Sequence, residues 1–138
     1  MQFFTLLAIS LTLSHKIFLL KPKKIVITGG PSTGKTSIIE KIELMGHACI
    51  HEISRSITLE AREQGIQQLF VSDPLLFSKK ITEGRINQFH EASKFPVKHV
   101  FMDRGLPDVV AYMDCFGQEY DHSFIEACEN YIYDDVFL

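Results

Sequence analysis

Cysteine is scarce in this 138-residue sequence, and its spacing excludes two classes of protein. Cys49, Cys115 and Cys128 are odd in number and far apart, and no C-x-x-C pair occurs. Neither a disulfide framework nor a zinc site is indicated, and the six histidines show no metal-ligand spacing either. We expect the three thiols to be buried as small apolar side chains in a reducing compartment, which indicates a cytoplasmic protein.

An excess of basic charge is also missing. The formal net charge is −3, so the sequence does not predict the positive surface of a nucleic-acid-binding protein, and we expect no nucleic-acid partner. Hydrophobic residues make up 46% of the chain and charged residues 22%, as in a folded globular domain. Because no internal repeat or low-complexity linker is visible, we predict one domain over residues 23–138.

Residues 1–22 are predicted to be an apolar N-terminal extension of that domain. Phe3 to Leu13 is apolar at eight of its eleven positions, but as a helix it would span only about 16 Å, against about 30 Å of bilayer hydrocarbon. It has neither a basic start nor a clear small-residue cleavage site, so a signal peptide is not indicated. We interpret it as an extension outside the folded domain, with a membrane anchor through residues 1–20 as the alternative.

The most informative stretch is Gly-Gly-Pro-Ser-Thr-Gly-Lys-Thr at residues 29–36, which matches the phosphate-binding loop G-x-x-x-x-G-K-[ST]. An apolar run at 24–28 precedes it as a strand, and a helix start follows it. In such a loop the backbone amides surround a phosphate chain, Lys35 reaches the β- and γ-phosphates, and the Thr36 hydroxyl ligates Mg²⁺. We therefore predict that ATP and Mg²⁺ bind at Gly29, Gly30, Pro31, Ser32, Thr33, Gly34, Lys35, Thr36 and Ser37.

Strands and helices alternate along the rest of the sequence. The predicted strands are 24–28, 47–51, 97–102 and one starting at 135, and the predicted helices are 36–44, 53–64, 74–92, a short one from 107, and 122–130. This order predicts an α/β fold with a mainly parallel sheet and helices on both faces. The spacing predicts two buried helix faces, which carry Ile38, Ile42 and Met45 in the first helix and Leu75, Thr82, Ile86 and Phe89 in the third.

Polar side chains follow the second and third predicted strands where each strand ends. Because the carboxyl ends of parallel strands share one edge, Glu52, Asp103 and Arg104 should face the phosphate-binding loop. A carboxylate at the place of Asp103 contacts the Mg²⁺ of a nucleotide. ATP-hydrolysing machines commonly have Glu next, whereas Arg104 can hold a phosphate or an acceptor hydroxyl, which favours phosphoryl transfer. The alternative for Asp103 and Arg104 is a strand-end cap and a surface salt bridge.

The same edge offers candidates for binding a phosphoryl acceptor. Glu52 could accept the proton of an acceptor hydroxyl, and Arg55, one helical turn later, could bind the acceptor. An ordinary ion pair between Glu52 and Arg55 is the alternative. Asp108 is a candidate substrate contact, although it could equally favour the N-terminus of its helix.

These motifs resemble those of a family of small bacterial AAA-labelled P-loop ATPases. The likeness rests on Gly29 to Thr36, on Glu52 with Arg55, and on Asp103 to Asp108 with Tyr112, and it covers residues 23–138. That family is similar to the ribosylnicotinamide kinase domain of a bacterial NAD regulator and, more distantly, to deoxynucleoside and thymidylate kinases. The resemblance implies a P-loop NTPase fold with a kinase-like strand order.

The resemblance further implies an acceptor-side carboxylate at Glu52, a metal-side carboxylate at Asp103 and a phosphate-side arginine at Arg104. It supplies no acceptor. Such kinases continue past the fourth strand with an arginine-bearing lid and a fifth strand, whereas this sequence ends within the fourth, so we expect a truncated domain.

Three functions stay open. The first is phosphoryl transfer from Mg-ATP to a nucleoside-like small molecule, with Lys35, Glu52, Asp103 and Arg104 as the catalytic residues. The second is a nucleotide-binding regulatory ATPase without an acceptor, and the third is an inactive truncated remnant. A translational GTPase is disfavoured because the base-reading motif N-K-x-D is missing.

Overall fold

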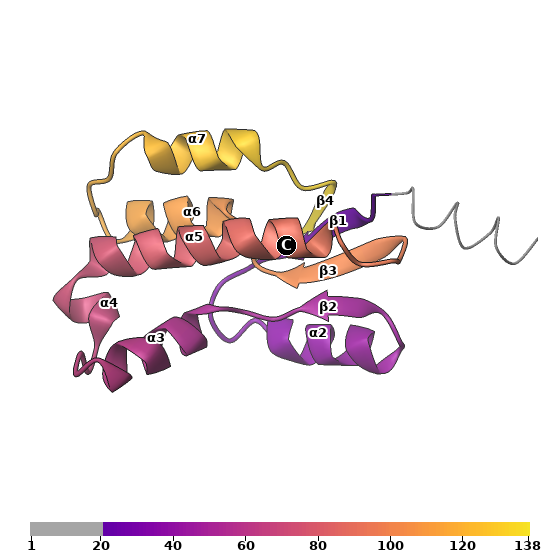
Figure 1. The fold of residues 1–138 in the computed structure, drawn as a ribbon, viewed down its shortest axis with the longest axis horizontal. Helices are drawn as coiled ribbons and strands as arrows, with labels where there is room; N and C mark the ends of the chain where they lie inside the picture. The colour runs from indigo at the N-terminus through magenta and orange to yellow at the C-terminus, as the bar shows by residue number, and fades with distance from the viewer. Residues whose placement is uncertain (1–20) are drawn as a thin grey trace, which may run out of the picture.

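The computed structural model describes residues 21–138, so all but the last two residues of the predicted extension lie outside the described part (Figure 1). Its strands are β1 (Lys23–Ile27), β2 (Ala48–Ile50), β3 (His99–Asp103) and β4 (Asp135–Phe137). Its helices are α2 (Lys35–Leu44), α3 (Ser54–Glu63), α4 (Leu69–Ser72), α5 (Pro74–Ala92), α6 (Pro107–Cys115) and α7 (Ser123–Asn130). In this part of the chain, no helix is long and apolar enough to cross a membrane.

The four strands form one parallel sheet in the order β2-β3-β1-β4. Parallel neighbours need a crossover connection, and each of these crossovers contains a helix. Ile27 pairs with both Asp103 and Phe137, so the strand ends that precede the predicted polar residues lie along one edge of the sheet. The predicted α/β fold and its kinase-like strand order are confirmed.

Helices cover both faces of the sheet and also extend past its C-terminal edge. Helix α5 lies over one face and α2 over the other, while α3 and α4 lie beyond the ends of the strands (Figure 1). One apolar cluster joins the sheet to α5 and contains Val26, Ile50, Ala92, Val100 and Met102. A second cluster joins the helices beyond the edge and contains Ile57, Ala61, Leu69, Ile81, Val109, Met113 and Phe124. The second cluster supports a helical region in front of the strand ends.

The predicted buried stripe of α2 is wrong. Ile39 is the apolar residue of this helix that is fully buried, whereas Ile38 is 48% exposed and Met45 is 71% exposed. The main contacts of the helix with the sheet are to β2 and β3, so its flank toward β1 and β4 is less covered. The periodicity located apolar residues on the helix, but it did not show which of them meets the sheet.

The buried face of α5 is also displaced from the predicted one. Ser78, Ile81, Arg85 and Ala92 are buried, and the predicted Leu75, Thr82, Ile86 and Phe89 flank them at intermediate exposure. The start of this helix is as predicted: Asp73 accepts a hydrogen bond from the Leu76 amide at 2.9 Å, and Pro74 occupies the first position.

The expectation that all three thiols are buried is wrong. Cys115 is exposed at the end of α6, while Cys49 and Cys128 are half-buried, so none of the three is a fully buried core residue. Burial raises the pKa of both half-buried thiols.

Candidate nucleotide site and adjoining cleft

The loop between β1 and α2 has the backbone of an anion-binding turn. Gly29 and Gly34 have φ values of 137° and 85°, and Ser32 also lies in the left-handed region at 59°. The hydrogen bond from the Ile38 amide to the Gly34 carbonyl, at 3.1 Å, is the first that α2 makes along its axis. No side chain caps this helix, so the amides of residues 35–37 are left to face a ligand.

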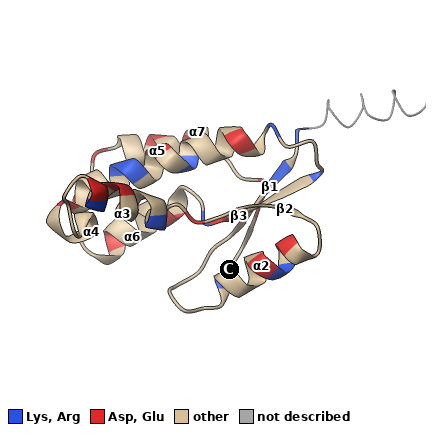
Figure 2. Ribbon diagram, turned by 60° about the horizontal axis from the view of Figure 1, so that its bottom comes forward, with Lys and Arg blue, Asp and Glu red and all other residues tan. Residues whose placement is uncertain are grey.

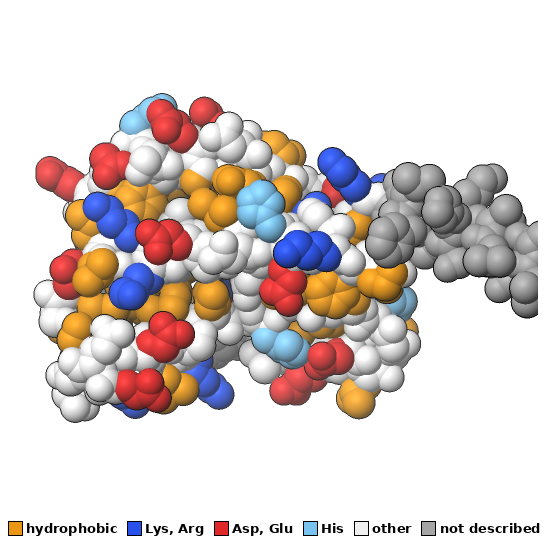
Figure 3. Space-filling model, in the orientation of Figure 1, with side chains coloured by type: hydrophobic (Ala, Val, Ile, Leu, Met, Phe, Trp, Pro, Cys, Tyr) orange, Lys and Arg blue, Asp and Glu red, His pale blue; other side chains and the backbone are white. Residues whose placement is uncertain are grey.

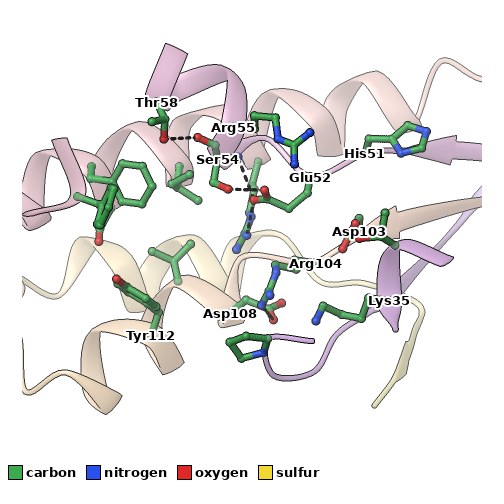
Figure 4. A pocket seen from close by; sticks show the side chains of 18 of the residues that line it. Lys35, His51, Glu52, Ser54, Arg55, Thr58, Asp103, Arg104, Asp108 and Tyr112 are labelled. Atoms are coloured by element: carbon green, nitrogen blue, oxygen red, sulfur yellow. Dashed lines mark hydrogen bonds and ion pairs between the residues drawn. The ribbon is translucent and has the colours of Figure 1, made fainter. Parts of the chain in front are cut away.

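The Lys35 side chain lies within the loop. It is buried, and its Nζ donates to the Gly30 carbonyl and, at 3.2 Å, to the Thr33 hydroxyl. Lys35 and Thr36 both line the same cleft as Asp103 and Arg104, as predicted from their positions at strand and loop ends. Figure 4 shows Lys35 and Asp103 on facing sides of this end of the cleft.

Asp103 carries a buried oxygen with no protein partner. The residue is 7% exposed, and among the described residues nothing donates a hydrogen bond to its Oδ1. Burial, followed by the nearby charge of Glu52, raises the pKa of this carboxyl, and the cations Arg104 and Lys35 oppose the shift. A buried carboxylate oxygen without a partner is what a hard cation such as Mg²⁺ requires, so the residues fit the metal.

The turn after β3 is fixed by Asp108. One oxygen of its carboxylate accepts from the Gly105 amide at 2.7 Å, and the other accepts from the Thr28 hydroxyl. The same carboxylate lies 3.6 Å from the Arg104 guanidinium. Arg104 itself has a φ of 73°, and its amide donates to the Ile27 carbonyl at 3.0 Å. Asp108 therefore ties α6 to the strand before the phosphate loop while it also lines the cleft.

The cation beside Glu52 is Arg85 of α5, a residue that the sequence analysis missed. Its guanidinium lies 3.8 Å from the Glu52 carboxylate and donates to the Gly105 carbonyl at 2.6 Å. Its side chain is 5% exposed, and burial lowers its pKa while Asp108 and Glu52 oppose that shift. The available signal was weak: Arg85 follows Ile81 by four residues on the inner face of α5.

Both carboxylate oxygens of Glu52 accept hydrogen bonds, and neither is paired with Arg55. The Ser54 amide donates to one Glu52 oxygen at 2.9 Å, and the Ser54 hydroxyl donates to the other. The exposed Arg55 makes no ion pair with Glu52, although both line the cleft (Figure 4). The sequence alternative of an ordinary pair between these two residues is therefore wrong.

The cleft continues from the phosphate loop into an apolar chamber among α3, α4, α5 and α6. The whole cleft, from the phosphate loop to the end of the chamber, has a volume of about 710 Å³. At the loop end it is lined by polar residues, and at the far end by Phe70, Phe77, Ile81, Val109 and Tyr112. The Phe70 and Phe77 rings meet edge to face at 6.1 Å. Helix α4, which supplies Phe70, was not predicted from the sequence.

A family model described as "AAA domain" matches residues 24–138, which include all four strands, apart from Lys23 at the start of β1, and every feature of the site. The chain belongs to this family. The match supports a nucleotide-binding P-loop protein and is consistent with the observed sheet order. No curated protein matches the chain.

The described part of the AAA domain does not form a complete metal site by itself. Over residues 21–138, no group of three or more His, Cys, Asp or Glu side chains could hold a metal by itself. A cation at Asp103 would thus need phosphate or water oxygens to complete its shell, which is how Mg²⁺ binds with nucleotides. Acidic and basic residues both occur along α2 and α5, so neither sign dominates these helices (Figure 2).

Proposed function

We propose that this AAA domain transfers the γ-phosphoryl group of Mg-ATP to a hydroxyl of a small, nucleoside-like acceptor. The observation that carries the proposal is the continuity of the cleft, which joins the phosphate loop to a chamber with aromatic walls. A domain that only hydrolyses ATP needs room for a water molecule beside the γ-phosphate. The chamber is much larger than that and suits a ring-bearing molecule.

The loop end of the cleft supports nucleotide binding. The uncapped amides at the start of α2 would hold phosphate oxygens, and Lys35 would exchange its carbonyl contact for the β- and γ-phosphates. Asp103 and Thr36 would hold Mg²⁺, because the unpartnered Asp103 oxygen and the Thr36 hydroxyl both belong to this end. When bound, Mg²⁺ neutralises the charge that develops on the phosphates.

Glu52 is the proposed acceptor-side base. Its carboxylate lies between the loop and the chamber, and the contacts with Ser54 and Arg85 fix its direction. In the proposed step, the acceptor oxygen bonds to the γ-phosphorus while its proton passes to Glu52. The bond from the γ-phosphorus to the β–γ bridging oxygen breaks, and ADP leaves.

The far end of the cleft indicates the chemistry of the acceptor. Phe70, Phe77 and Tyr112 offer flat apolar surfaces, so an uncharged ring fits this end better than a phosphate would. Arg55 lies at its border without an ion-pair partner among the described residues, and it would hold a hydroxyl or carbonyl of the acceptor. Arg104, which occupies the usual place of a water-activating Glu, supports transfer over hydrolysis.

Product analysis with labelled ATP tests the proposal. The protein would be incubated with Mg²⁺, γ-labelled ATP and a panel of nucleosides and ribosides, and labelled products would be separated. We expect label on one acceptor class. Label that appears only as free phosphate, at a rate no acceptor changes, would establish the regulatory ATPase instead.

Three variants make the test specific. Lys35→Ala should abolish both products and the thermal shift caused by Mg-ATP. Glu52→Gln should lower transfer by about 10²–10⁴-fold while the thermal shift with Mg-ATP remains. The matched control is Glu60→Gln, an exposed carboxylate on α3, which should transfer at the wild-type rate. If Glu52→Gln and Glu60→Gln transfer equally well, Glu52 is not the base.

A further inference from the structure

Among the described residues, an open apolar groove runs between α2 and the sheet, on the flank of α2 that carries Ile38 and Ile42. On this face the helix packs against β2 and β3, and no described helix lies over β1 and β4 (Figure 1). The groove has a volume of about 620 Å³, and its walls include Ile27, Ile38, Ile42, Phe101 and Phe137. Phosphate-loop residues close one of its ends, so the groove borders the candidate site without belonging to its acceptor cleft.

The exposed side chains around the groove are large and apolar. Ile38 and Phe137 project into solvent at its walls, Phe137 with an exposed fraction of 60%. Leu44, at the end of α2, is 88% exposed, and Met45 follows it. On the face seen in Figure 3, the surface over α2 is mixed, with acidic and histidine side chains beside an isolated hydrophobic one. Among the residues that line the groove only Lys35 has a charged side chain, and an exposed apolar surface of this kind is typical of a contact site for another apolar element.

The chain itself carries a segment of the matching chemistry. Phe3 to Leu13 contains no charged residue, and as a helix its length of about 16 Å is close to the length of about 15 Å of the ten-residue α2. We propose that residues 3–13 pack into the groove as a helix alongside α2 and complete the second face of the sheet. The segment would thus be an internal part of the domain and would not enter a membrane.

The point at which this segment joins the body permits the arrangement. It leads through residues 14–21 into Pro22, which is buried, and then directly into β1, a central strand that borders the groove. Because α2 runs back from the phosphate loop, its exposed end at Leu44 lies toward the edge of the sheet where β1 begins. Eight linking residues can span up to about 26 Å, enough to turn the segment back along α2.

Cysteine cross-linking in the full chain tests the proposal. All variants carry Cys115→Ser, which removes the exposed native thiol. Ala8→Cys would be combined with Ile38→Cys, which lines the groove, or with Leu59→Cys. Leu59 is an exposed residue of α3 that does not line the groove, so it serves as the control position. A short bis-maleimide is added, and products are sized by mass spectrometry. We expect a monomer-sized 8–38 product to form at least tenfold faster than the 8–59 product.

Several outcomes would overturn the proposal. Equal rates at positions 38 and 59 would mean that the segment has no fixed place. An 8–38 product of dimer size only, rising with concentration, would assign the groove to a second copy. Loss of the cross-link on addition of phosphatidylcholine vesicles, with co-sedimentation of the protein, would assign the segment to a membrane.

A second measurement does not depend on engineered cysteines. Leu6→Asp with Leu7→Asp should increase hydrogen exchange at the α2 amides at least tenfold, while amides of α7 exchange at the wild-type rate. Unchanged exchange in α2, or a uniform increase throughout the chain, would refute the docking. Neither outcome depends on phosphoryl transfer, so the proposed function is tested separately.

Discussion

Asp103→Asn should stabilise the protein in the absence of Mg²⁺ while it removes the response to Mg-ATP. The wild-type carboxylate is buried with an unpartnered oxygen, and burial raises its pKa above the ordinary value of 3.8. The native state therefore keeps a proton that the unfolded chain has released, and stability falls as pH rises through that interval. Asn has nearly the same size but no charge, so the variant escapes this penalty.

The size of the effect follows from the missing hydrogen bond. A buried polar group without a partner costs about 1–3 kcal/mol and a charged one costs more, so replacing the carboxylate with a neutral amide should give a net gain of about 1 kcal/mol. For a domain of this size that corresponds to about 3–6 °C in Tm. The difference between the two proteins should vanish near pH 3.8, grow with pH, and level off once Asp103 is ionised in the native state.

Thermal melts in chelator-treated buffer, from pH 4 to pH 8, measure this difference. With Mg-ATP at one hundred times its Kd, wild type should gain about 2.7 kcal/mol, and Asp103→Asn should gain much less. Asp134→Asn is the control, because its carboxylate accepts from the Lys24 amide at 2.7 Å and its loss should destabilise the protein by up to about 1 kcal/mol. The reasoning would be refuted if Asp103→Asn has a lower Tm than wild type at neutral pH. It would also be refuted if the difference in Tm between the two proteins does not change with pH.

Two further substitutions probe the turn after β3. Gly105→Ala would place a Cβ 2.9 Å from the Tyr133 ring and 3.3 Å from Val26, so urea unfolding should show a loss of about 1–3 kcal/mol, whereas Gly30→Ala, whose nearest atom is 3.8 Å away, should lose much less. Arg85→Met should lose about 2 kcal/mol in the same assay, because the Gly105 carbonyl loses its donor and Glu52 loses the cation beside it. Arg85→Lys should recover only part of that loss, since a single ammonium cannot reproduce the fork of contacts, and full recovery would show that charge alone matters.

The architecture could be predicted from the sequence because its signals are local. The phosphate loop is a contiguous motif, and each strand before a polar residue is a short apolar run, so the parallel sheet and the edge that carries the candidate site could be predicted from spacing. The faces of the helices could not be predicted in the same way. Ile38 and Met45 have the right spacing on α2, yet the sheet meets Ile39, because the position of a helix over its sheet depends on contacts between distant segments.

The polar contacts of the site were only partly predictable for the same reason. Glu52 and Asp103 stand out because each ends a strand, whereas Arg85 lies in the middle of a helix whose sequence gives no sign that an arginine is buried. Its partner, the Gly105 carbonyl, is twenty residues away and is a backbone group. The aromatic wall supplied by α4 depends on a four-residue helix, which is too short to produce a periodic pattern.

The strand that carries Asp103 and the strand that precedes Glu52 differ in how firmly they are anchored. β3 has five residues and a neighbour on each side, whereas β2 has three residues and a single neighbour. Opening of the edge strand would break few hydrogen bonds, while release of the central strand would require the whole sheet to separate. In the proposed reaction, the wall beside Glu52 would therefore open more readily than the wall beside Asp103, so the acceptor could enter and leave while the nucleotide stays bound.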